Sequence, residues 1–587
     1  MEFTIKDLSI EENKMDISIM LHFDKYLPGV TEPRVILCFD NGTDERRLPI
    51  LINACYPDVA GEGATAFGLY QYTFENVFWN CAWKECDIRF EVEYGPESSD
   101  AVAFTFDNPK SVDKQASQKG ETLLHINLNE PIDATIPDNP GVGKVFLGMV
   151  INAVNILLGI CLIPWFILDC LGIMFLGTEK RNETIEGSLK KQFVYYVGWR
   201  YFGFNRITNG VKGVKEKIFT LIHLWQDALH PHKEGVLFLS VRRNDMTGNF
   251  EYVYDELKRL DPNIKITKWL HAEEIQEIKI RTLIEMVKKI ARAKVIIVDD
   301  FVPYLSQINV SSKSKVVQLW HACGAFKTFG FSRLGKKGGP TQKSKNHRDY
   351  DYVFVSSEHI GKYYAEGFGV ADHKVYSLGV PRTDIFFSET YKKKITEQIY
   401  QNYPFLKDKK ILLFAPTFRG NGKKTAYYDK DAFDPNRVIG ALSDEYVLLI
   451  KHHPFVQMKY QVKPENEGRI FDFSQESEIN ELLFITDVLI TDYSSVIYEA
   501  SLLNLPILFY AYDVQEYIAY RDFYARDFNE FVPGKIVRDE KSMIQAIIEK
   551  DFEHEKVQTF SYKNFDIQDG KSSQRVAQKI LDIALDR

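Results

Sequence analysis

Paired cysteines are missing from this sequence. The seven cysteines are scattered, odd in number and never in a CxxC arrangement, which argues against a disulfide framework and against a zinc site. We therefore expect the chain to work in a reducing compartment. The first residues also lack the basic and apolar stretches of a secretory signal peptide. The cysteines are Cys38, Cys55, Cys81, Cys86, Cys161, Cys170 and Cys323.

An excess of basic charge is missing as well. The formal net charge is −8, from 73 basic and 81 acidic residues, which argues against a general nucleic-acid-binding protein. The composition, with 45% hydrophobic and 26% charged residues, has neither a collagen-like nor a disordered bias. A chain of 587 residues is too long for one hydrophobic core, so we expect several domains.

Residues 1–110 predict a small β-sandwich. Short stretches with strand-like alternation recur here, and Asn41-Gly42 directly after one of them is a strong hairpin signal. Short strands at this spacing are typical of sandwiches, and no catalytic group of residues is visible among them. We predict a structural or docking domain, followed by a polar linker at residues 111–143 that contains Pro and Gly.

Residues 144–232 predict helices associated with a membrane. The run Val145–Leu168 carries no charged residue and is long enough to cross a bilayer. Asn152, Pro164 and Asp169 weaken a simple span and favour a re-entrant or interfacial helical hairpin. Basic residues on both sides suit ends that lie in the cytoplasm, and the aromatic and basic residues that follow suit the headgroup region. A buried pair of core helices is the alternative.

From residue 233 onward, apolar strands alternate with helices. Continuous apolar strands such as Gly235–Ser240 and Lys410–Pro416 predict parallel sheets. We place one Rossmann-like half at residues 233–395 and a second at residues 396–587, which together form a GT-B-like α/β architecture. In such a fold, ligands bind where the carboxyl ends of the strands of both halves face each other.

Four polar motifs directly follow predicted strands, where this crevice should lie. His321 follows an apolar strand and can take a proton from an attacking hydroxyl group, although a lone histidine is more often structural. His453 and Arg419 also follow strands, and arginine is a bidentate phosphate donor. Ser494 and Ser495 open a predicted helix and can bind an anion or simply cap the helix. Together the motifs point to the handling of a phosphate group.

This part of the chain resembles the CDP-glycerol glycerophosphotransferase family, which contains teichoic acid primases and polymerases. The resemblance covers residues 315–534 directly. It extends back to about residue 235. The motifs that carry it are Trp320-His321, Gly379-Val-Pro-Arg382, Ala415-Pro-Thr-Phe-Arg419, His453-Pro454 and Thr491-Asp-Tyr-Ser-Ser495.

The resemblance implies a role for each motif residue. His321 is the candidate base, and His453 assists at the transferring phosphate. Arg419, Ser494 and Ser495 hold the pyrophosphate of a CDP-polyol donor. The predicted substrate-binding set is completed by Arg382, Thr417, Asp492 and Glu499.

The implied reaction transfers glycerol phosphate or ribitol phosphate to a hydroxyl group of a lipid-linked or polymeric anionic acceptor and releases CMP. It would take place at the cytoplasmic face of the membrane during teichoic acid or capsule synthesis. No cluster of metal ligands is evident, and a transient Mg²⁺ ion on the pyrophosphate is compatible with the pattern. The sequence Ala322-Cys-Gly-Ala325 looks closer to the primase-like branch than to the polymerases.

Two other functions stay open at this point. The same crevice would serve a GT-B glycosyltransferase that uses a nucleotide sugar, although a carboxylate that contacts the sugar would then be expected. A membrane-tethered scaffold without catalysis is the third hypothesis, and the retained histidines and serines argue against it. The sequence leaves open which polyol is transferred and whether one unit or a polymer is made.

Overall fold

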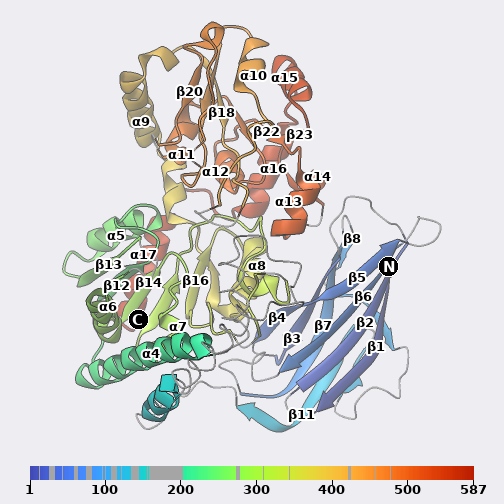
Figure 1. Cartoon of the computed structure of the whole chain (residues 1–587), viewed down its shortest axis with the longest axis vertical. Coiled ribbons are helices and arrows are strands. Elements are labelled where there is room, and N and C mark those ends of the chain that lie inside the picture. Colours follow the sequence, from blue (N-terminus) through green and yellow to red (C-terminus); the bar gives the residue numbers. More distant parts are fainter. Residues whose placement is uncertain are drawn as a thin grey trace, which may run out of the picture.

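The computed structural model describes residues 1–157 and 203–587, apart from short gaps of which the longest are 107–115 and 134–144. Two α/β lobes lie one above the other, and a β-sandwich lies beside the lower one (Figure 1). The chain begins in the sandwich and ends beside the lower lobe. We call the lower lobe the N-lobe and the upper one the C-lobe.

Residues 1–133 form two sheets around one apolar core, which confirms the predicted sandwich. Along β2, buried and partly exposed residues alternate, so that Met15, Ile17 and Ile19 face the core. The predicted hairpin joins β3 to β4, where Asp40 pairs with Glu45. One sheet contains, in spatial order, β5 (Ile52–Pro57), β6 (Ala64–Thr73), β2 (Lys14–Phe23), β1 (Glu2–Glu11) and β9 (Phe104–Phe106); the other contains β10 (Ala116–Gln118), β11 (Leu124–Asp133), β7 (Ala82–Tyr94), β3 (Arg34–Asp40) and β4 (Glu45–Ile50), with β8 (Glu97–Ser99) beside β7.

The sandwich is longer than the sequence predicts. The stretch 111–143, predicted as a linker, contains β10 and β11, and β11 pairs with β7. Leu124 and Ile126 are fully buried in the sandwich core and alternate with polar residues. The prediction rested on the Pro and Gly content of this stretch and not on this short alternation, and the domain extends to Asp133 rather than ending near residue 110.

The N-lobe is built on a six-stranded parallel sheet in the order β13-β12-β14-β15-β16-β17. Its central strands β12 and β14 are buried along their whole length, as expected for a sheet with helices on both faces. The strands are β12 (Val236–Ser240), β13 (Ile266–Leu270), β14 (Val295–Val298), β15 (Lys315–Gln318), β16 (Tyr352–Val355) and β17 (Val375–Ser377); the helices are α5 (Asn249–Leu260), α6 (Ile280–Arg292), α7 (Leu305–Ile308), α8 (Glu358–Phe368) and the 3-10 helices η2 (Gly330–Arg333), η3 (Asp372–Lys374) and η4 (Pro381–Phe387).

The C-lobe repeats this design with a parallel sheet in the order β20-β19-β18-β21-β22-β23. The two Rossmann-like halves are thereby confirmed. Its strands are β18 (Lys410–Phe414), β19 (Tyr446–Ile450), β20 (Ile470–Asp472), β21 (Val488–Thr491), β22 (Ile507–Tyr510) and β23 (Lys535–Val537); its helices are α9 (Glu389–Asn402), α10 (Pro435–Gly440), α11 (Ile479–Leu482), α12 (Val496–Leu502), α13 (Val514–Arg521), α14 (Phe528–Phe531), α15 (Glu540–Glu549), α16 (Glu555–Asn564) and the 3-10 helices η5 (Pro404–Leu406), η6 (Pro464–Asn466) and η7 (Leu483–Ile485).

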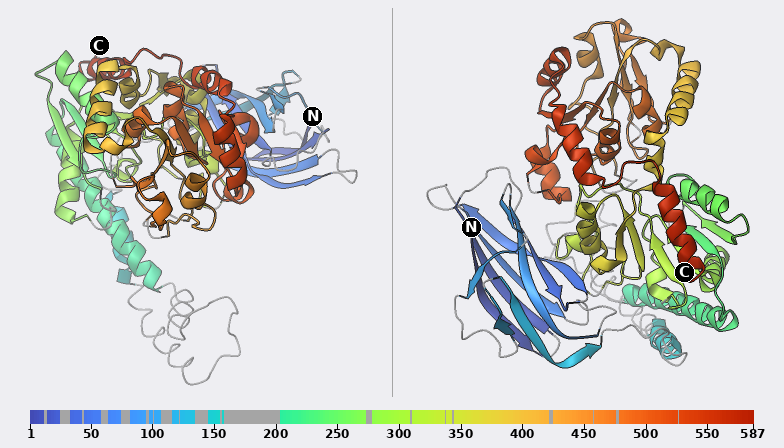
Figure 2. Two further views of the ribbon diagram at one scale, coloured as in Figure 1. Left: turned by 90° about the horizontal axis from the view of Figure 1, so that it is seen from above. Right: turned by 180° about the vertical axis from the view of Figure 1, so that it is seen from behind.

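Two lobe boundaries differ from the prediction. Helix α9 packs against α11 and η7 of the C-lobe, so the lobes divide near residue 388 rather than at 395. The last helix, α17 (Ser572–Ala584), crosses back and packs against α5 of the N-lobe, as the view from behind shows (Figure 2). Val576 and Ile580 are buried there with Phe238 and Phe250. Residues 572–587 therefore belong to the N-lobe, although they were assigned to the C-lobe from the sequence.

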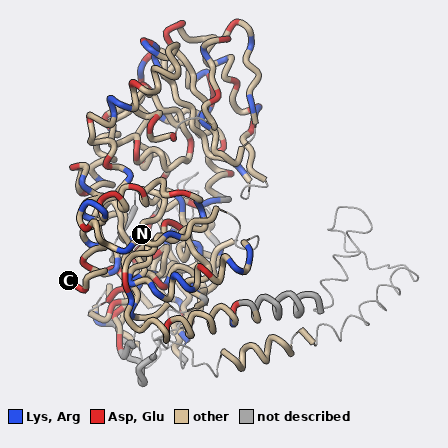
Figure 3. Tube along the Cα trace, turned by 90° about the vertical axis from the view of Figure 1, so that its left-hand side faces the viewer, with Lys and Arg blue, Asp and Glu red and all other residues tan. Residues whose placement is uncertain are grey.

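The predicted membrane segment lies partly outside the described residues, which omit 158–202. Residues 145–154 are helical and uncharged, and this helix is tan in Figure 3. The long helix α4 (Gly203–Leu229) packs against α6 and α7 of the N-lobe and buries Phe219. In the described part of the chain, no helix has the length and apolar character needed to cross a membrane.

Charged side chains fix the sandwich to the lobes. Arg34 of β3 pairs with Glu366 of α8, and both side chains are buried. The same guanidinium lies 5.0 Å from the centre of the Tyr524 ring of the C-lobe. On the next strand, Nη1 of Arg46 donates to the carbonyl oxygen of Gly369 (3.5 Å). The sandwich is thus attached through buried charge as well as through apolar contact.

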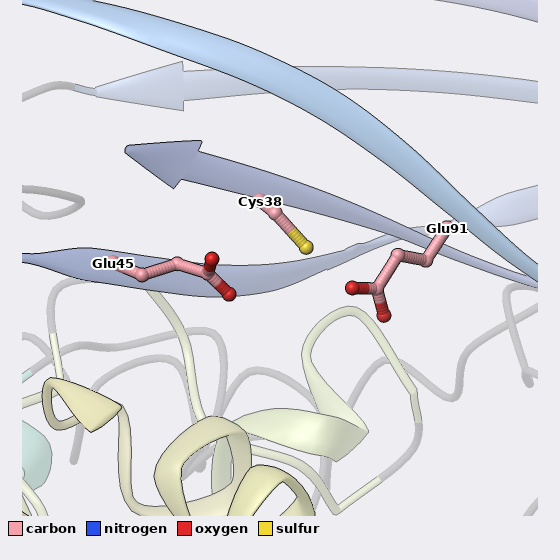
Figure 4. A group of neighbouring side chains, drawn as sticks. All are labelled: Cys38, Glu45 and Glu91. Atoms are coloured by element: carbon pink, nitrogen blue, oxygen red, sulfur yellow. The ribbon is translucent and has the colours of Figure 1, made fainter. Parts of the chain in front are cut away.

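Three potential metal ligands, Cys38, Glu45 and Glu91, lie together on this sheet (Figure 4). Both carboxylates are already engaged by guanidinium groups. Arg47 pairs with Glu91, and Nη1 of Arg89 lies 2.7 Å from Oε2 of Glu45. Burial raises the pKa of the Cys38 thiol, which keeps it uncharged. The two arginines offset the charge of the two glutamates, so the group has no net negative charge with which to bind a cation. We interpret it as an ion-pair network.

We predict that Ile580→Ala destabilises the N-lobe by about 2–5 kcal/mol, because it leaves a cavity between α17 and the sheet. Thermal unfolding followed by circular dichroism measures the effect. Gln574→Ala on the exposed face of the same helix is the control and should unfold like the parent protein. Equal melting temperatures for both variants would contradict the placement of α17 in the N-lobe core.

Candidate active site

Each sheet has one place where its strand order reverses. This switch point lies between β12 and β14 in the N-lobe and between β18 and β21 in the C-lobe. Ligands of parallel α/β sheets bind outside the carboxyl ends of the strands at such points. The segments after these four strands carry Arg242 and Asp300 in the N-lobe, and Thr417 and Asp492 in the C-lobe. The loop after β15 contacts α12 of the other lobe, and the charge of Arg242 acts on His453 after β19, so these ends of the two sheets face each other; we call the space between them the crevice.

His321 is presented by a strained turn after β15. The preceding residue, Trp320, has a φ of 52°, which is rare for a bulky side chain and is typical of functional sites. The turn is held because Nδ2 of Asn249 donates to the carbonyl oxygen of Trp320 (3.0 Å). The indole stacks on Phe329 and lies 4.4 Å from the imidazole of His321, centre to centre. The sequence-predicted histidine is therefore fixed at the crevice.

Charged groups surround this imidazole. Nδ1 of His321 lies 3.6 Å from Oδ2 of Asp300. Burial lowers the pKa of His321 to about 4, with Asp300 acting to raise it and the cations Arg242 and Arg382 acting to lower it. At neutral pH the ring is uncharged and can accept a proton. Asp300 was not among the predicted site residues, although an acidic pair at a strand end is a readable signal.

The second histidine motif follows β19 and contains two different environments. His452 is buried and stacks on Tyr460 with 5.7 Å between ring centres. His453 is partly exposed, and its Nδ1 accepts a hydrogen bond from the backbone N–H of Phe455 (3.2 Å). Burial lowers the pKa of His453 to about 4, and Arg242 and Lys327 of the N-lobe add to the effect. His453, the predicted residue of the pair, thus faces the crevice.

Thr417, Arg419 and Asp492 form one cluster at the C-lobe switch point. Oδ1 of Asp492 accepts hydrogen bonds from both the backbone N–H and the hydroxyl of Thr417 (2.8 Å each). Nη1 of Arg419 lies 2.9 Å from Asp492, and Nε and Nη2 donate to the two oxygens of Asp513 (2.7 Å each). The bidentate partner of Arg419 in this structure is therefore a carboxylate of the protein. A direct phosphate contact by Arg419 stays a prediction.

The two predicted serines lie where α12 begins. Oγ of Ser494 accepts a long hydrogen bond from the backbone N–H of Val496 (3.4 Å). Ser495 occupies the N-cap position, and its side chain makes no capping hydrogen bond in the described structure. Both side chains are partly exposed. Capping therefore leaves the Ser495 hydroxyl available, and its contact with an anion stays a prediction.

Arg382 and Glu499 were predicted to bind substrate, but the structure pairs them with each other across the two lobes. Arg382 lies in η4, Glu499 lies in α12, and their side chains form a largely buried ion pair. Nη1 of Arg382 also donates to the carbonyl oxygen of His321 (2.9 Å), and Sγ of Cys323 donates to Glu499 (3.2 Å). This pair therefore connects the loop of His321 to α12, the helix that begins directly after the two serines.

The loop after His321 packs tightly against the C-lobe. A Cβ atom at Gly324 would lie 2.0 Å from the ring of Tyr498, so glycine is required there. A cavity of about 630 Å³ lies on another side of this loop, where Ala325 and Tyr498 form part of its wall together with side chains of the sandwich, α8 and α16. This cavity is lined by neither His321 nor His453, and we do not assign the reaction to it.

We predict that Arg382→Met destabilises the protein by about 3–5 kcal/mol, because it leaves the carboxylate of Glu499 buried and unpaired. The double variant Arg382→Met/Glu499→Leu should recover most of this loss. Thermal unfolding measures both variants. Arg259→Met, which removes an exposed arginine paired with Glu256, should change stability by less than about 1 kcal/mol. A double variant that is as unstable as Arg382→Met alone would contradict the pairing.

Curated relatives are similar to this chain over its lobes. The teichoic acid poly(ribitol-phosphate) polymerase of Bacillus spizizenii is 47% identical over 365 residues, which cover 62% of this chain and 59% of that protein. The ribitol-phosphate primase of the same species is 35% identical over 63% of this chain and 95% of its own length. The chain was expected to be more similar to the primases, but its identity to the polymerase is higher than its identity to the primase. A glycerol-phosphate primase of Bacillus subtilis is 35% identical over 50% of this chain and 75% of its own length.

Solved structures support the fold. The wall teichoic acid polymerase TagF aligns with a TM-score of 0.53 and 21% identity over 66% of this chain and 98% of its own. A variant of that polymerase has been soaked with CDPG. The family model described as CDP-Glycerol:Poly(glycerophosphate) glycerophosphotransferase matches residues 222–582, which is more than half of the chain and includes both lobes. The chain therefore belongs to the CDP-glycerol:poly(glycerophosphate) glycerophosphotransferase family.

Proposed function

We propose that this chain transfers a polyol phosphate from a CDP-polyol donor to a hydroxyl group of a teichoic acid acceptor and releases CMP. The observation that carries the proposal is the imidazole of His321 beside the N-lobe switch point, on a loop that contacts α12, the helix that begins directly after Ser494 and Ser495. A base on one lobe and anion-binding groups on the other suit the transfer of a phosphoryl group. The names of the relatives agree with this reaction.

The reaction would proceed in one displacement. His321 takes the proton of the acceptor hydroxyl, and the oxygen attacks the phosphorus that carries the polyol. The new phosphorus–oxygen bond forms as the bond to the phosphate of CMP breaks, and CMP leaves with the electron pair. The serine hydroxyls at the start of α12 would stabilise the charge that develops on the phosphate oxygens. His453 would act at the same phosphate from the C-lobe.

Ribitol phosphate is the group that we propose is transferred. Three ribitol-phosphate polymerases are 42–47% identical to this chain, whereas the glycerol-phosphate primases are 27–35% identical. The higher identity favours a ribitol donor and a polymeric acceptor. Mg²⁺ on the donor pyrophosphate is a further part of the proposal, since a divalent ion binds such oxygens directly.

We propose that the protein attaches to the cytoplasmic face of the membrane, where a lipid-linked acceptor would lie. The support is the helix at residues 145–154 and the described residues directly after it, whose apolar side chains are largely exposed. An exposed apolar surface of this kind marks a binding surface for protein or lipid. The exposed side chains are Phe146, Leu147, Val150, Ile151, Val154 and Leu157.

The donor assay tests the reaction. The protein is incubated with a lipid-linked acceptor and with CDP-ribitol, CDP-glycerol or UDP-sugars, and the release of CMP or UDP is measured with Mg²⁺ or with EDTA. We predict CMP release from CDP-ribitol. His321→Asn should lower the rate by at least about 100-fold, because general-base catalysis contributes roughly that much.

Three outcomes would contradict this proposal. Release of UDP alone would indicate a nucleotide-sugar glycosyltransferase. Release of neither nucleotide from a folded protein would indicate a scaffold. An unchanged rate in His321→Asn would show that His321 is not the base. A rate that is the same with EDTA would contradict only the part of the proposal that concerns Mg²⁺.

Binding to vesicles tests the membrane site. The variant Phe146→Ser/Leu147→Ser/Ile151→Ser should reduce co-sedimentation with phosphatidylglycerol vesicles, because it removes apolar area from the proposed contact. The control Phe67→Ser/Leu69→Ser changes two exposed apolar residues of the sandwich and should bind like the parent protein. Equal binding of both variants would contradict attachment through this helix.

A further inference from the structure

One carboxylate oxygen next to the candidate base has two competing neighbours. Oδ2 of Asp300, after β14, lies 3.2 Å from Nη1 of Arg242 and 3.6 Å from Nδ1 of His321. Arg242 follows β12, on the other side of the N-lobe switch point. The side chain of Arg242 is 44% exposed, and those of Asp300 and His321 are about one quarter exposed. All three groups therefore reach the crevice.

The two neighbours are not held equally. The contact between Arg242 and Asp300 has hydrogen-bonding length, whereas the 3.6 Å between Nδ1 of His321 and Asp300 is longer than a hydrogen bond, and the imidazole also interacts with the backbone of Asp299. As long as the guanidinium of Arg242 donates to Asp300, its positive charge weakens the effect of the carboxylate on the pKa of His321. Burial lowers the pKa of His321 to about 4, and the cations Arg242 and Arg382 oppose the effect of Asp300, which acts to raise it.

Arg242 also faces the opposite lobe. The charge of Arg242 acts on His453, which follows β19 of the C-lobe, as well as on His321. An exposed guanidinium whose charge acts on both histidines is well placed to meet the transferring phosphate. A guanidinium binds phosphate oxygens in a bidentate manner, so an anionic donor would compete with Asp300 for Arg242.

We propose that Asp300 is the positioning residue of His321, and that Arg242 is a phosphate-binding residue that releases Asp300 when an anionic donor enters the crevice. The proposal rests on the proposed function. Once released, the carboxylate accepts the Nδ1–H of His321, which leaves Nε2 free to take the proton of the acceptor hydroxyl. The released charge also makes the imidazole a stronger base, closer to the range in which base catalysis is efficient.

The other charged groups near His321 are fixed in place. Nη1 of Arg382 donates to the carbonyl oxygen of His321, while its other nitrogen pairs with Glu499. The neighbour of Asp300, Asp299, is paired with Arg243 (2.5 Å). His347 packs edge-on against the same tryptophan as His321, is half-buried, and has its pKa lowered to about 4 by desolvation. The exposed pair of Arg242 and Asp300 is therefore the pair that a ligand can rearrange.

The pH dependence of CMP release tests the proposal in the full chain. The limb of the profile at low pH reports protonation of the base, in the free enzyme for kcat/KM and in the donor complex for kcat. We expect the kcat limb at higher pH than the kcat/KM limb, because the donor frees the charge of Asp300. Asp300→Asn should lower kcat at least about tenfold and reduce the separation of the two limbs, of which only the part due to the charge of the donor itself should remain. A separation in Asp300→Asn as large as in the parent protein would overturn the proposal.

Arg242→Gln gives the complementary result. It should raise the KM for the donor about tenfold or more, and it should move the kcat/KM limb to higher pH, because Asp300 is free even without donor. The control Arg259→Gln removes an exposed arginine that pairs with Glu256 on α5, and it should leave both limbs unchanged. An Arg242→Gln variant with an unchanged donor KM and limb would also overturn the proposal.

A measurement without turnover separates this inference from the proposed function. In protein labelled with ¹⁵N-histidine, the pKa of His321 is followed by NMR with and without inorganic pyrophosphate, and His321→Asn identifies the signal. The charge of pyrophosphate raises the pKa in every variant. We expect the largest rise in the parent protein and a smaller one in both Asp300→Asn and Arg242→Gln. Equal rises in all three would overturn the inference even if CMP release is observed.

Discussion

The geometry of the crevice depends on one buried ion pair, that of Arg382 with Glu499. Arg382 also donates to the carbonyl oxygen of His321 and, through its backbone N–H, to Asn249, which in turn holds the carbonyl oxygen of Trp320. A single residue, Arg382, thereby holds the turn that carries the candidate base next to α12 of the other lobe. Buried ion pairs contribute little net stability because desolvation opposes their attraction. We therefore interpret this pair as a device for alignment.

Much of the fold follows from local sequence patterns. Buried strands such as β12 and β18 read as continuous apolar runs, and the chain places polar motifs directly after them. Parallel sheets bring such strand ends to one edge, so His321, His453 and the serines could be expected in one crevice. Elements whose place depends on distant partners could not be found in this way. Strand β11 joins the sandwich by pairing with β7, and α17 belongs to a lobe whose other elements precede it by about two hundred residues.

Pairing between charged side chains was not predictable from the sequence. Arg382 and Glu499 are separated by 117 residues, and each is a reasonable substrate ligand when it is read alone. Arg419 is a similar case, because its partner Asp513 lies 94 residues away. Motif positions indicate where a side chain lies, but the tertiary fold decides which charges are already neutralised. The strand-end position of Asp300 could be read from the sequence, but its short distance to His321 could not.

These neutralised charges have a consequence for the proposed reaction. At the C-lobe switch point, the guanidinium of Arg419 is engaged by Asp492 and Asp513, so this turn is rigid before any donor binds but offers little free positive charge. The exposed cation near both histidines, Arg242, comes from the N-lobe. A pyrophosphate that is held by the serine hydroxyls of the C-lobe would thus form its ion pair with Arg242 of the N-lobe. Under the proposed function, donor binding and alignment of the base then require the same closed arrangement of the lobes, which the ion pair of Arg382 and Glu499 maintains.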